Sequence, residues 1–137
     1  MELIPRLLSE NLTEFAIAAQ DFATSCVAEN FEIPEEDRLL WIGGVALQNP
    51  LVRQHSLHRT QDEAALLAAK ETFPFLVIQG TEDQHLYVDK IEAVMKETFG
   101  NVEFHRVEGV GHAAFYEVPE FVNQTVLDFV KKQVGGN

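Results

Sequence analysis

The stretch "PFLVIQGTED", residues 74–83, decides which fold this chain can adopt. Its apolar run, residues 75–78, is continuous rather than alternating, which is typical of a parallel strand buried on both faces. A glycine-containing turn follows the run and leads to Asp83. Ligands bind beyond the carboxyl ends of strands in parallel α/β sheets, so Asp83 lies where a functional side chain is expected.

The residues after this strand predict a helix, a second strand and a last helix. Apolar residues recur at helical spacing over 86–99, and Gly100 is expected to end that helix as its C′ residue. "VEFHRV", Val102–Val107, alternates in the manner of a strand at a sheet edge. Pro119 then begins a last helix. A right-handed crossover makes the two strands parallel, so the sequence predicts an α/β fold.

Only helices are predicted before residue 74. Helix starts are expected after Asn11, at Pro34, at Pro50 and at Thr60. Asn11 and Thr60 are each followed three residues later by a glutamate, which is the capping-box arrangement. The helix from Thr60 is expected to run through Lys70. The sequence therefore predicts two parts, a helical segment 1–73 and a β-α-β-α part 74–137.

The overall charge narrows the range of partners. The 137 residues include 22 acidic and 10 basic side chains, which gives a net charge of −12. This excess repels phosphate backbones and anionic lipids, so we expect no nucleic-acid partner and no membrane partner. Cys26 is the only cysteine, which rules out an internal disulfide. No apolar run approaches a membrane span, and no signal-peptide pattern opens the chain, so a cytoplasmic location is expected.

A histidine stands after the second strand at the position that Asp83 has after the first. It is His112, in the stretch "GVGHAAFYEVPE", residues 109–120. Neighbouring strands lie about 5 Å apart, so we expect both side chains at one rim of the sheet, within hydrogen-bond reach. A carboxylate bound to one imidazole nitrogen fixes the tautomer and stabilises the imidazolium that forms when the other nitrogen takes a proton. Alone, each residue is more simply a turn or surface residue. Glu82 is the replacement acid if Asp83 points away.

No metal and no cofactor are expected. His55 and His58, in "HSLH", are three positions apart and could share a helix face, as metal ligands do. Spacing places no third ligand near them, so two surface histidines are the favoured interpretation.

The remaining candidates have simpler structural interpretations. His85 is interpreted as a turn residue, with a gating role beside Asp83 as the alternative. His105 is interpreted as an edge-strand side chain and Glu117 as a helix-start acid, with a pocket role second. Trp41 is expected in a helical core together with Leu39, Leu40 and Leu47.

The two quoted stretches together resemble the C-terminal part of an α/β-hydrolase, over residues 74–132. In that family a strand ending in G-x-x-D presents the acid of a catalytic triad, and a later G-H step carries the triad histidine. The resemblance implies that Asp83 is the acid and His112 the general base. It also implies that the helical segment 1–73 takes the position of the family's cap. The expected fold is therefore a partial α/β-hydrolase: a cap segment, then two parallel strands with two flanking helices.

The chain departs from the family in lacking a nucleophile. No G-x-S-x-G motif is present, nor one with Asp or Cys in the centre, and Ser9, Ser25 and Ser56 have no flanking glycines. The glycine loop that forms part of the family's oxyanion hole is also missing. We therefore expect a partial sequence, a truncated product or half of a split enzyme, inactive by itself. The complete enzyme would hydrolyse an ester, lactone or similar acyl bond of a small-molecule substrate. The alternative is a non-catalytic interaction module.

The first strand is expected to keep one open edge. In the family fold it has strands on both sides, whereas this sequence supplies only Val102–Val107 as a neighbour. Unpaired N–H and C=O groups along a strand are a template for pairing with another chain. Self-association, or a partner that supplies the front half of the fold, is therefore expected at this edge.

Overall fold

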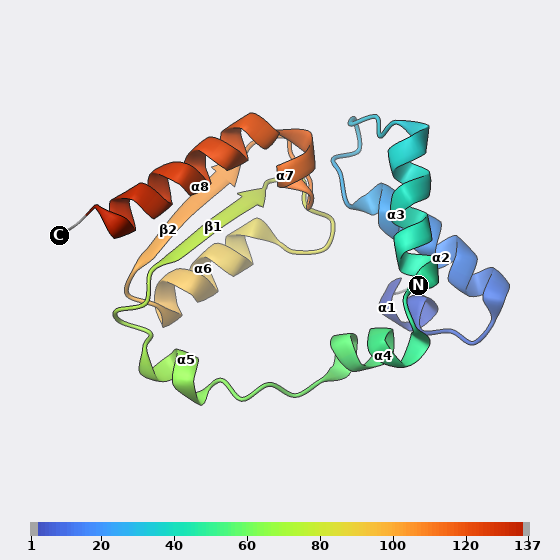
Figure 1. The fold of residues 1–137 in the computed structure, drawn as a ribbon, viewed down its shortest axis with the longest axis horizontal. Helices are drawn as coiled ribbons and strands as arrows, with labels where there is room; N and C mark the ends of the chain where they lie inside the picture. The colour runs from blue at the N-terminus through green and yellow to red at the C-terminus, as the bar shows by residue number, and fades with distance from the viewer. Residues whose placement is uncertain (1–2, 136–137) are drawn as a thin grey trace. The chain divides into compact units, whose positions relative to one another are not determined.

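The computed structural model of the chain describes residues 3–135. By their contacts these residues form two compact units (Figure 1). The first unit comprises the residues up to Ser25 together with Glu32–Gln61. The second comprises Cys26–Phe31 together with the residues from Asp62 onward. The contacts thus divide the chain at other places than residue 73, and the cap role of the helical segment stays a prediction.

Four helices build the first unit. They are α1 (Leu3–Leu7), α2 (Leu12–Ser25), α3 (Glu35–Leu47) and α4 (Pro50–His58). Helix α2 packs against both α1 and α3. Its buried side chains are the small residues Ala18, Ala19 and Ala23. The expected core around Trp41 does not form as predicted, because Leu39, Leu40 and Leu47 are exposed.

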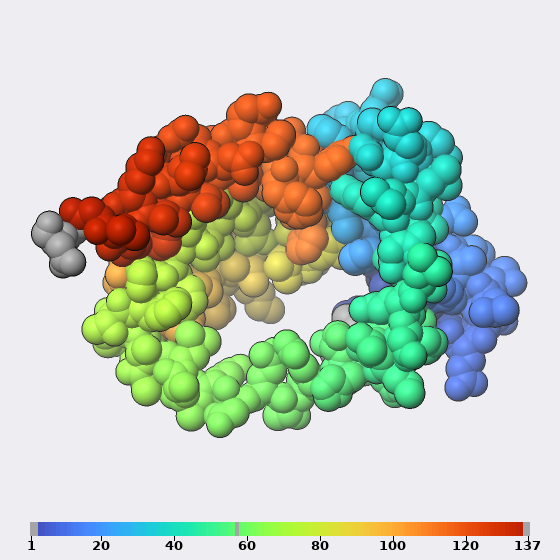
Figure 2. All heavy atoms as spheres, in the orientation of Figure 1, coloured from blue at the N-terminus to red at the C-terminus, as the bar shows by residue number. Residues whose placement is uncertain are grey.

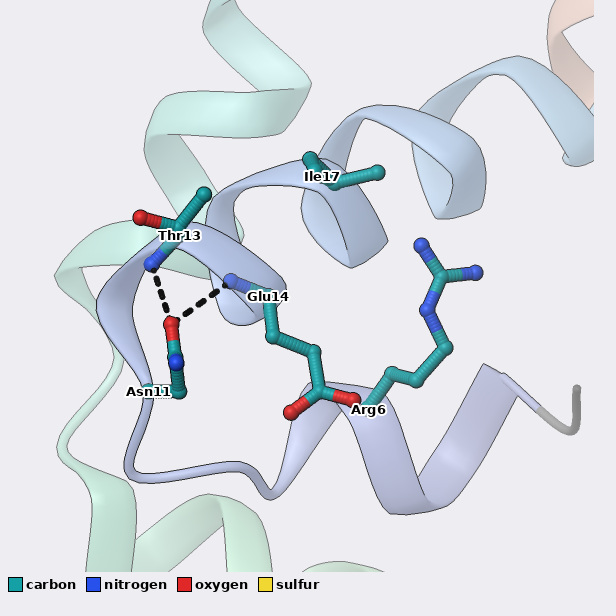
Figure 3. Close-up of a pocket in the computed structure, with 5 residues that line it drawn as sticks. All are labelled: Arg6, Asn11, Thr13, Glu14 and Ile17. Carbon is teal, nitrogen blue, oxygen red and sulfur yellow. Dashed lines mark hydrogen bonds between the residues drawn. The ribbon is translucent and has the colours of Figure 1, made fainter.

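The start of α2 confirms Asn11 as the cap residue. Its Oδ1 accepts the N–H groups of Thr13 at 3.0 Å and Glu14 at 3.1 Å (Figure 3). The reciprocal half of the capping box is absent. The Glu14 carboxylate instead accepts the hydroxyl of Ser9 at 2.5 Å, and the Asn11 N–H donates to that hydroxyl oxygen. The Ser9 hydroxyl therefore stands between the two groups, the Asn11 N–H and the Glu14 carboxylate, that the capping box would bond directly.

The helix predicted from Thr60 through Lys70 is wrong in both bounds. Helix α5 covers only Ala64–Ala68, and its first turn is held by Asp62, whose Oδ1 accepts the Ala64 N–H at 3.0 Å. The Lys70 carbonyl accepts the Gly100 N–H at 3.0 Å, so the chain at Lys70 bonds to a distant loop instead of continuing the helix.

The second unit contains the predicted strand–helix–strand–helix order. Strand β1 (Phe75–Gly80) pairs in parallel with β2 (Val102–Val107), in the register Phe75↔Val102 to Gly80↔Val107. Helix α6 (Val88–Thr98) connects the strands, and α8 (Pro119–Val134) follows β2. Figure 1 shows α6 and α8 on opposite sides of the two strands. In the space-filling view α8 forms one continuous ridge (orange to red in Figure 2). A short helix, α7 (Ala114–Glu117), precedes α8 and was not predicted.

Burial along β1 increases toward its carboxyl end. Residues 75–78 are only partly buried, contrary to the prediction, whereas Gln79 and Gly80 are buried. Gly100 does not act as a left-handed C′ residue, since Gly109, at φ 71°, is the only residue with positive φ among those described. A Cβ at Gly100 would lie 2.6 Å from the carboxylate of Glu71, an exposed side chain, and 3.4 Å from the Glu71 backbone.

Candidate active site

Asp83 and His112 meet at the carboxyl ends of the paired strands. Asp83 follows β1 and His112 follows β2, two strands whose last residues, Gly80 and Val107, lie opposite each other. The imidazole Nδ1 of His112 lies 2.9 Å from Oδ2 of Asp83. The Asp83 side chain is 3% exposed and that of His112 is 40% exposed. The hydrogen bond expected from the sequence is therefore present, with a buried acid and an accessible imidazole.

The Asp83 carboxylate is held by further donors. Its Oδ1 accepts the N–H of His85 at 2.7 Å and of Leu86 at 3.0 Å. Its Oδ2 also accepts Nε2 of Gln79 at 3.3 Å. Burial acts to raise the pKa of Asp83, but the hydrogen bonds from His112, His85 and Leu86 outweigh it, and the pKa lies below its usual value. Asp83 is therefore a carboxylate at neutral pH.

The charge on Asp83 fixes the tautomer of neutral His112. A carboxylate only accepts hydrogen bonds, so the Nδ1 that faces it carries the proton. The other nitrogen, Nε2, is then a proton acceptor. A ring that is 40% exposed can present this nitrogen to a reacting group. The pair thus has the chemistry of a general base with an orienting acid.

Two further side chains lie beside the pair. The His85 ring meets the His112 ring edge to face, with centroids 4.9 Å apart, and its Nε2 lies 4.0 Å from Sγ of Cys26. Burial, and secondarily the charge of Asp83, raise the pKa of Cys26 to about 11. Cys26 is therefore a neutral thiol and a poor nucleophile. His85 was interpreted from the sequence as a turn residue, and the structure adds a ring contact with His112.

Close backbone contacts explain two glycines around His112. A Cβ at Gly80 would lie 1.9 Å from the Val110 carbonyl oxygen, and one at Gly111 would lie 2.4 Å from the backbone of Val27. The Ala113 N–H donates to the Cys26 carbonyl at 2.6 Å. The loop that carries His112 is therefore pressed against residues 26–28, a contact that no local pattern indicates.

Glu117 does not lie at the start of the last helix, where the sequence predicted it to be. It is the last residue of α7 rather than an acid at the start of α8. Its Oε1 accepts the Gly111 N–H at 2.8 Å, and its Oε2 accepts the Ala28 N–H at 3.3 Å. The only sequence signal for this role is an acid a few residues after a glycine-rich turn, which is too common to be decisive.

The other candidate residues lie away from the pair. Glu82 is exposed, and its backbone N–H bonds to Val110. His105 lies 3.0 Å from Glu103 on β2. His55 and His58 are exposed on α4 beside a cavity of about 350 Å³. Within residues 3–135 no three His, Cys, Asp or Glu side chains gather as a metal site.

Two larger cavities lie in the first unit. One, of about 510 Å³, is lined by residues of α1 and α2 (Figure 3). The other, of about 500 Å³, is lined by the segment between α1 and α2 and by residues in or next to α2, α3 and α4. Neither cavity is lined by Asp83 or His112.

Several solved structures have the same arrangement of helices and strands as this chain. A protein from Burkholderia cenocepacia to which aryl esterase activity is ascribed matches with a TM-score of 0.85 and 21% identity, covering 98% of this chain and 48% of its own. An esterase from Exiguobacterium antarcticum matches with a TM-score of 0.75 and 22% identity, over 93% and 47%. A bromoperoxidase from Bacillus anthracis matches with a TM-score of 0.74 and 19% identity, over 93% and 48%. No family model and no curated protein matches the sequence.

The chain thus has part of the α/β-hydrolase fold, as the sequence resemblance implied. It spans about half the length of the solved structures that it matches. At identities below a quarter the likeness concerns the fold, and function is argued from the site itself. No helix within residues 3–135 is long and apolar enough to cross a membrane.

Proposed function

We propose that the chain supplies the C-terminal part of an α/β-hydrolase that cleaves an ester, lactone or similar acyl bond of a small molecule. Asp83 and His112 would be the acid and the base of its triad. The observation that carries the proposal is the 2.9 Å contact between Nδ1 of His112 and the buried Asp83 carboxylate. The esterases among the structurally similar proteins support the type of reaction.

The chemistry follows from the tautomer of His112. Its Nε2 would take the proton of a nucleophile as that group attacks the acyl carbon. The imidazolium that forms lies against Asp83, whose negative charge stabilises it. The same Nε2–H would then protonate the leaving alcohol, which returns the histidine to its starting state. We place the nucleophile, a serine, aspartate or cysteine, outside the 137 residues, since no G-x-S-x-G motif and no form of it with Asp or Cys in the centre occurs in them. We assign the reaction to the cytoplasm.

A reconstitution experiment tests this function. The chain is mixed with the nucleophile-bearing N-terminal half of an esterase of this fold and assayed on p-nitrophenyl acetate. We expect hydrolysis that depends on both parts and falls by about 10³-fold or more with His112→Ala or Asp83→Asn. Glu82→Gln, which removes an exposed charge from the same loop, is the matched control and should leave the rate unchanged. Restored hydrolysis that survives His112→Ala would contradict the assignment.

A non-catalytic interaction module is the second candidate. The observation that favours it is that β1 pairs only with β2 among the described residues, so its other edge has no partner strand. On this proposal the edge binds a second copy of the chain or a partner that supplies the front half of the fold. Loss of ester hydrolysis in every reconstituted mixture, together with stable association, would favour this function.

A further inference from the structure

Glu117 joins two backbone segments that are far apart in the sequence. One carboxylate oxygen accepts the Gly111 N–H, immediately before His112. The other accepts the Ala28 N–H, 89 positions away from Glu117. Both N–H groups belong to residues that are buried. Because a buried N–H without an acceptor costs free energy, each of these groups needs a partner, and one carboxylate serves both.

The contact beside Glu117 leaves no room for a side chain at Gly111. A Cβ at Gly111 would lie 2.5 Å from the Ala28 nitrogen and 2.4 Å from the Val27 carbonyl carbon. Two backbone segments at this distance present their N–H groups to the same small space. A bidentate acceptor such as a carboxylate can bind both, whereas a hydroxyl or a single carbonyl does so less readily.

The position of this contact determines where His112 lies. Gly111 precedes the histidine, and the following residue, Ala113, donates its N–H to the Cys26 carbonyl at 2.6 Å. The backbone is therefore fixed on both sides of His112. The imidazole of His112 is 40% exposed and contacts the His85 ring edge to face. The backbone that Glu117 holds therefore contributes, together with this ring contact, to keeping the imidazole against Asp83.

We propose that Glu117 is a positioning residue, which sets the hydrogen bond between His112 and Asp83 by fixing the histidine loop to residues 26–28. Any effect of Glu117 on catalysis rests on the proposed hydrolase function, but its effect on the hydrogen bond between His112 and Asp83 can be measured without an enzyme assay. Glu117 reaches neither reacting group directly, so it acts only through the backbone of Gly111 and Ala28.

The test uses the full chain and two NMR readouts at the pair. One is the pKa of Asp83, from its carboxyl carbon shift, and the other is the His112 Nδ1–H proton signal. His112→Ala defines complete loss of the bond and raises the Asp83 pKa toward its usual value. With Glu117→Ala we expect most of that rise and loss of the Nδ1–H signal. Glu117→Gln keeps one acceptor oxygen and should fall between the parent chain and Glu117→Ala.

A control variant separates an effect on the histidine loop from an effect on the stability of the whole fold. Glu120→Gln removes an exposed acid at the start of α8 and should change neither readout. A folded Glu117→Ala chain with an unchanged Asp83 pKa and an intact Nδ1–H signal overturns the proposal. If Glu117→Ala does not fold, Glu117→Gln decides by the same readouts. If neither variant folds, the proposal is also overturned, because Glu117 would then hold the whole fold rather than the loop. Failure of the reconstituted hydrolysis would leave these readouts unaffected.

Discussion

Hydrogen bonds from His112 and from the N–H groups of His85 and Leu86 keep the Asp83 carboxylate charged. The side chain of Gln79 donates to it as well. A carboxyl group that is 3% exposed would favour its neutral form if it had no such donors. The donors reverse this preference, and the resulting negative charge orients His112.

Replacing Asp83 tests this balance as a function of pH. The folded-state pKa lies below the unfolded value of about 3.9, so ionised Asp83 stabilises the fold above that pH. This contribution is lost as the pH falls through the folded-state pKa. We expect Asp83→Asn to lower the free energy of unfolding by about 1–3 kcal/mol at neutral pH. The difference from the parent chain should shrink as the pH falls below the unfolded value and through the folded-state pKa.

Urea unfolding between pH 7 and pH 2 provides the measurement. Glu82→Gln is the matched control, because Glu82 is exposed on the same loop, and it should follow the parent chain at every pH. A difference between Asp83→Asn and the parent chain that stays constant down to pH 2 would show that the charge of Asp83 is not what stabilises the fold.

At the scale of elements, the ends of β1 and β2 place the site. The parallel register brings Gly80 opposite Val107, so the two loops that follow leave the sheet side by side. The Thr81 N–H and the Thr81 hydroxyl continue this contact to Val107 and Glu108. The loops then touch at Gly80, where only a glycine leaves room for the Val110 carbonyl. The pair therefore depends on backbone packing as well as on the two side chains.

Gly80→Ala tests how much this contact contributes. The added Cβ would lie 1.9 Å from the Val110 oxygen, so the loop must move, at a cost of about 1–3 kcal/mol or more. Gly44→Ala, in α3 with open space around its Cβ, should instead stabilise the chain by about 0.5–1 kcal/mol. Urea denaturation of both variants checks the prediction, and equal effects of the same sign would refute it.

At the scale of the whole molecule, the described residues contain a base and an acid at the rim of a two-stranded sheet. Two strands form a marginal sheet unless other elements cover it. Helices α6 and α8 lie on opposite sides of the strands, but among residues 3–135 no strand pairs with the outer edge of β1. The proposed hydrolysis thus needs a nucleophile, and the outer edge of β1 needs a partner strand.

The chain alone is expected to have no esterase activity. An Asp–His pair without a nucleophile can only assist water, and loss of a triad serine lowers turnover by on the order of 10⁶. Purified chain and its His112→Ala variant should hydrolyse p-nitrophenyl acetate at the same rate as buffer. Turnover clearly above buffer that disappears in His112→Ala would refute this prediction.

The outer edge of β1 is expected to drive association. The N–H groups of Phe75 and Thr81 point toward β2, so by alternation those of Leu76 and Ile78 point outward. In dilute solution these two amides should exchange faster than those of Val77 and Gln79. They should become protected as the chain concentration rises.

Light scattering with hydrogen exchange measures this association. The net charge of −12 opposes it at low salt, so added salt should promote it. A monomer at high micromolar concentration, with Leu76 and Ile78 protected from exchange, would show that the chain closes its own edge.

The sequence by itself determined the order of the two strands and the two long helices after residue 74, though not the short helix α7, and the partnership of Asp83 with His112. Continuous apolar residues, helical spacing and turn glycines act over a few positions, so they predict strands and helices from local sequence. The handedness of the crossover then makes the strands parallel. This rule brings together two residues 29 positions apart without any knowledge of packing.

Only the tertiary structure decided what surrounds the pair. Glu117 bonds to Ala28, and the His85 ring contacts that of His112. Each of these contacts depends on which backbone groups are buried against one another, and no local periodicity encodes that choice. A buried N–H donates to whichever acceptor packing brings within reach, and for Ala28 that acceptor lies 89 positions along the chain.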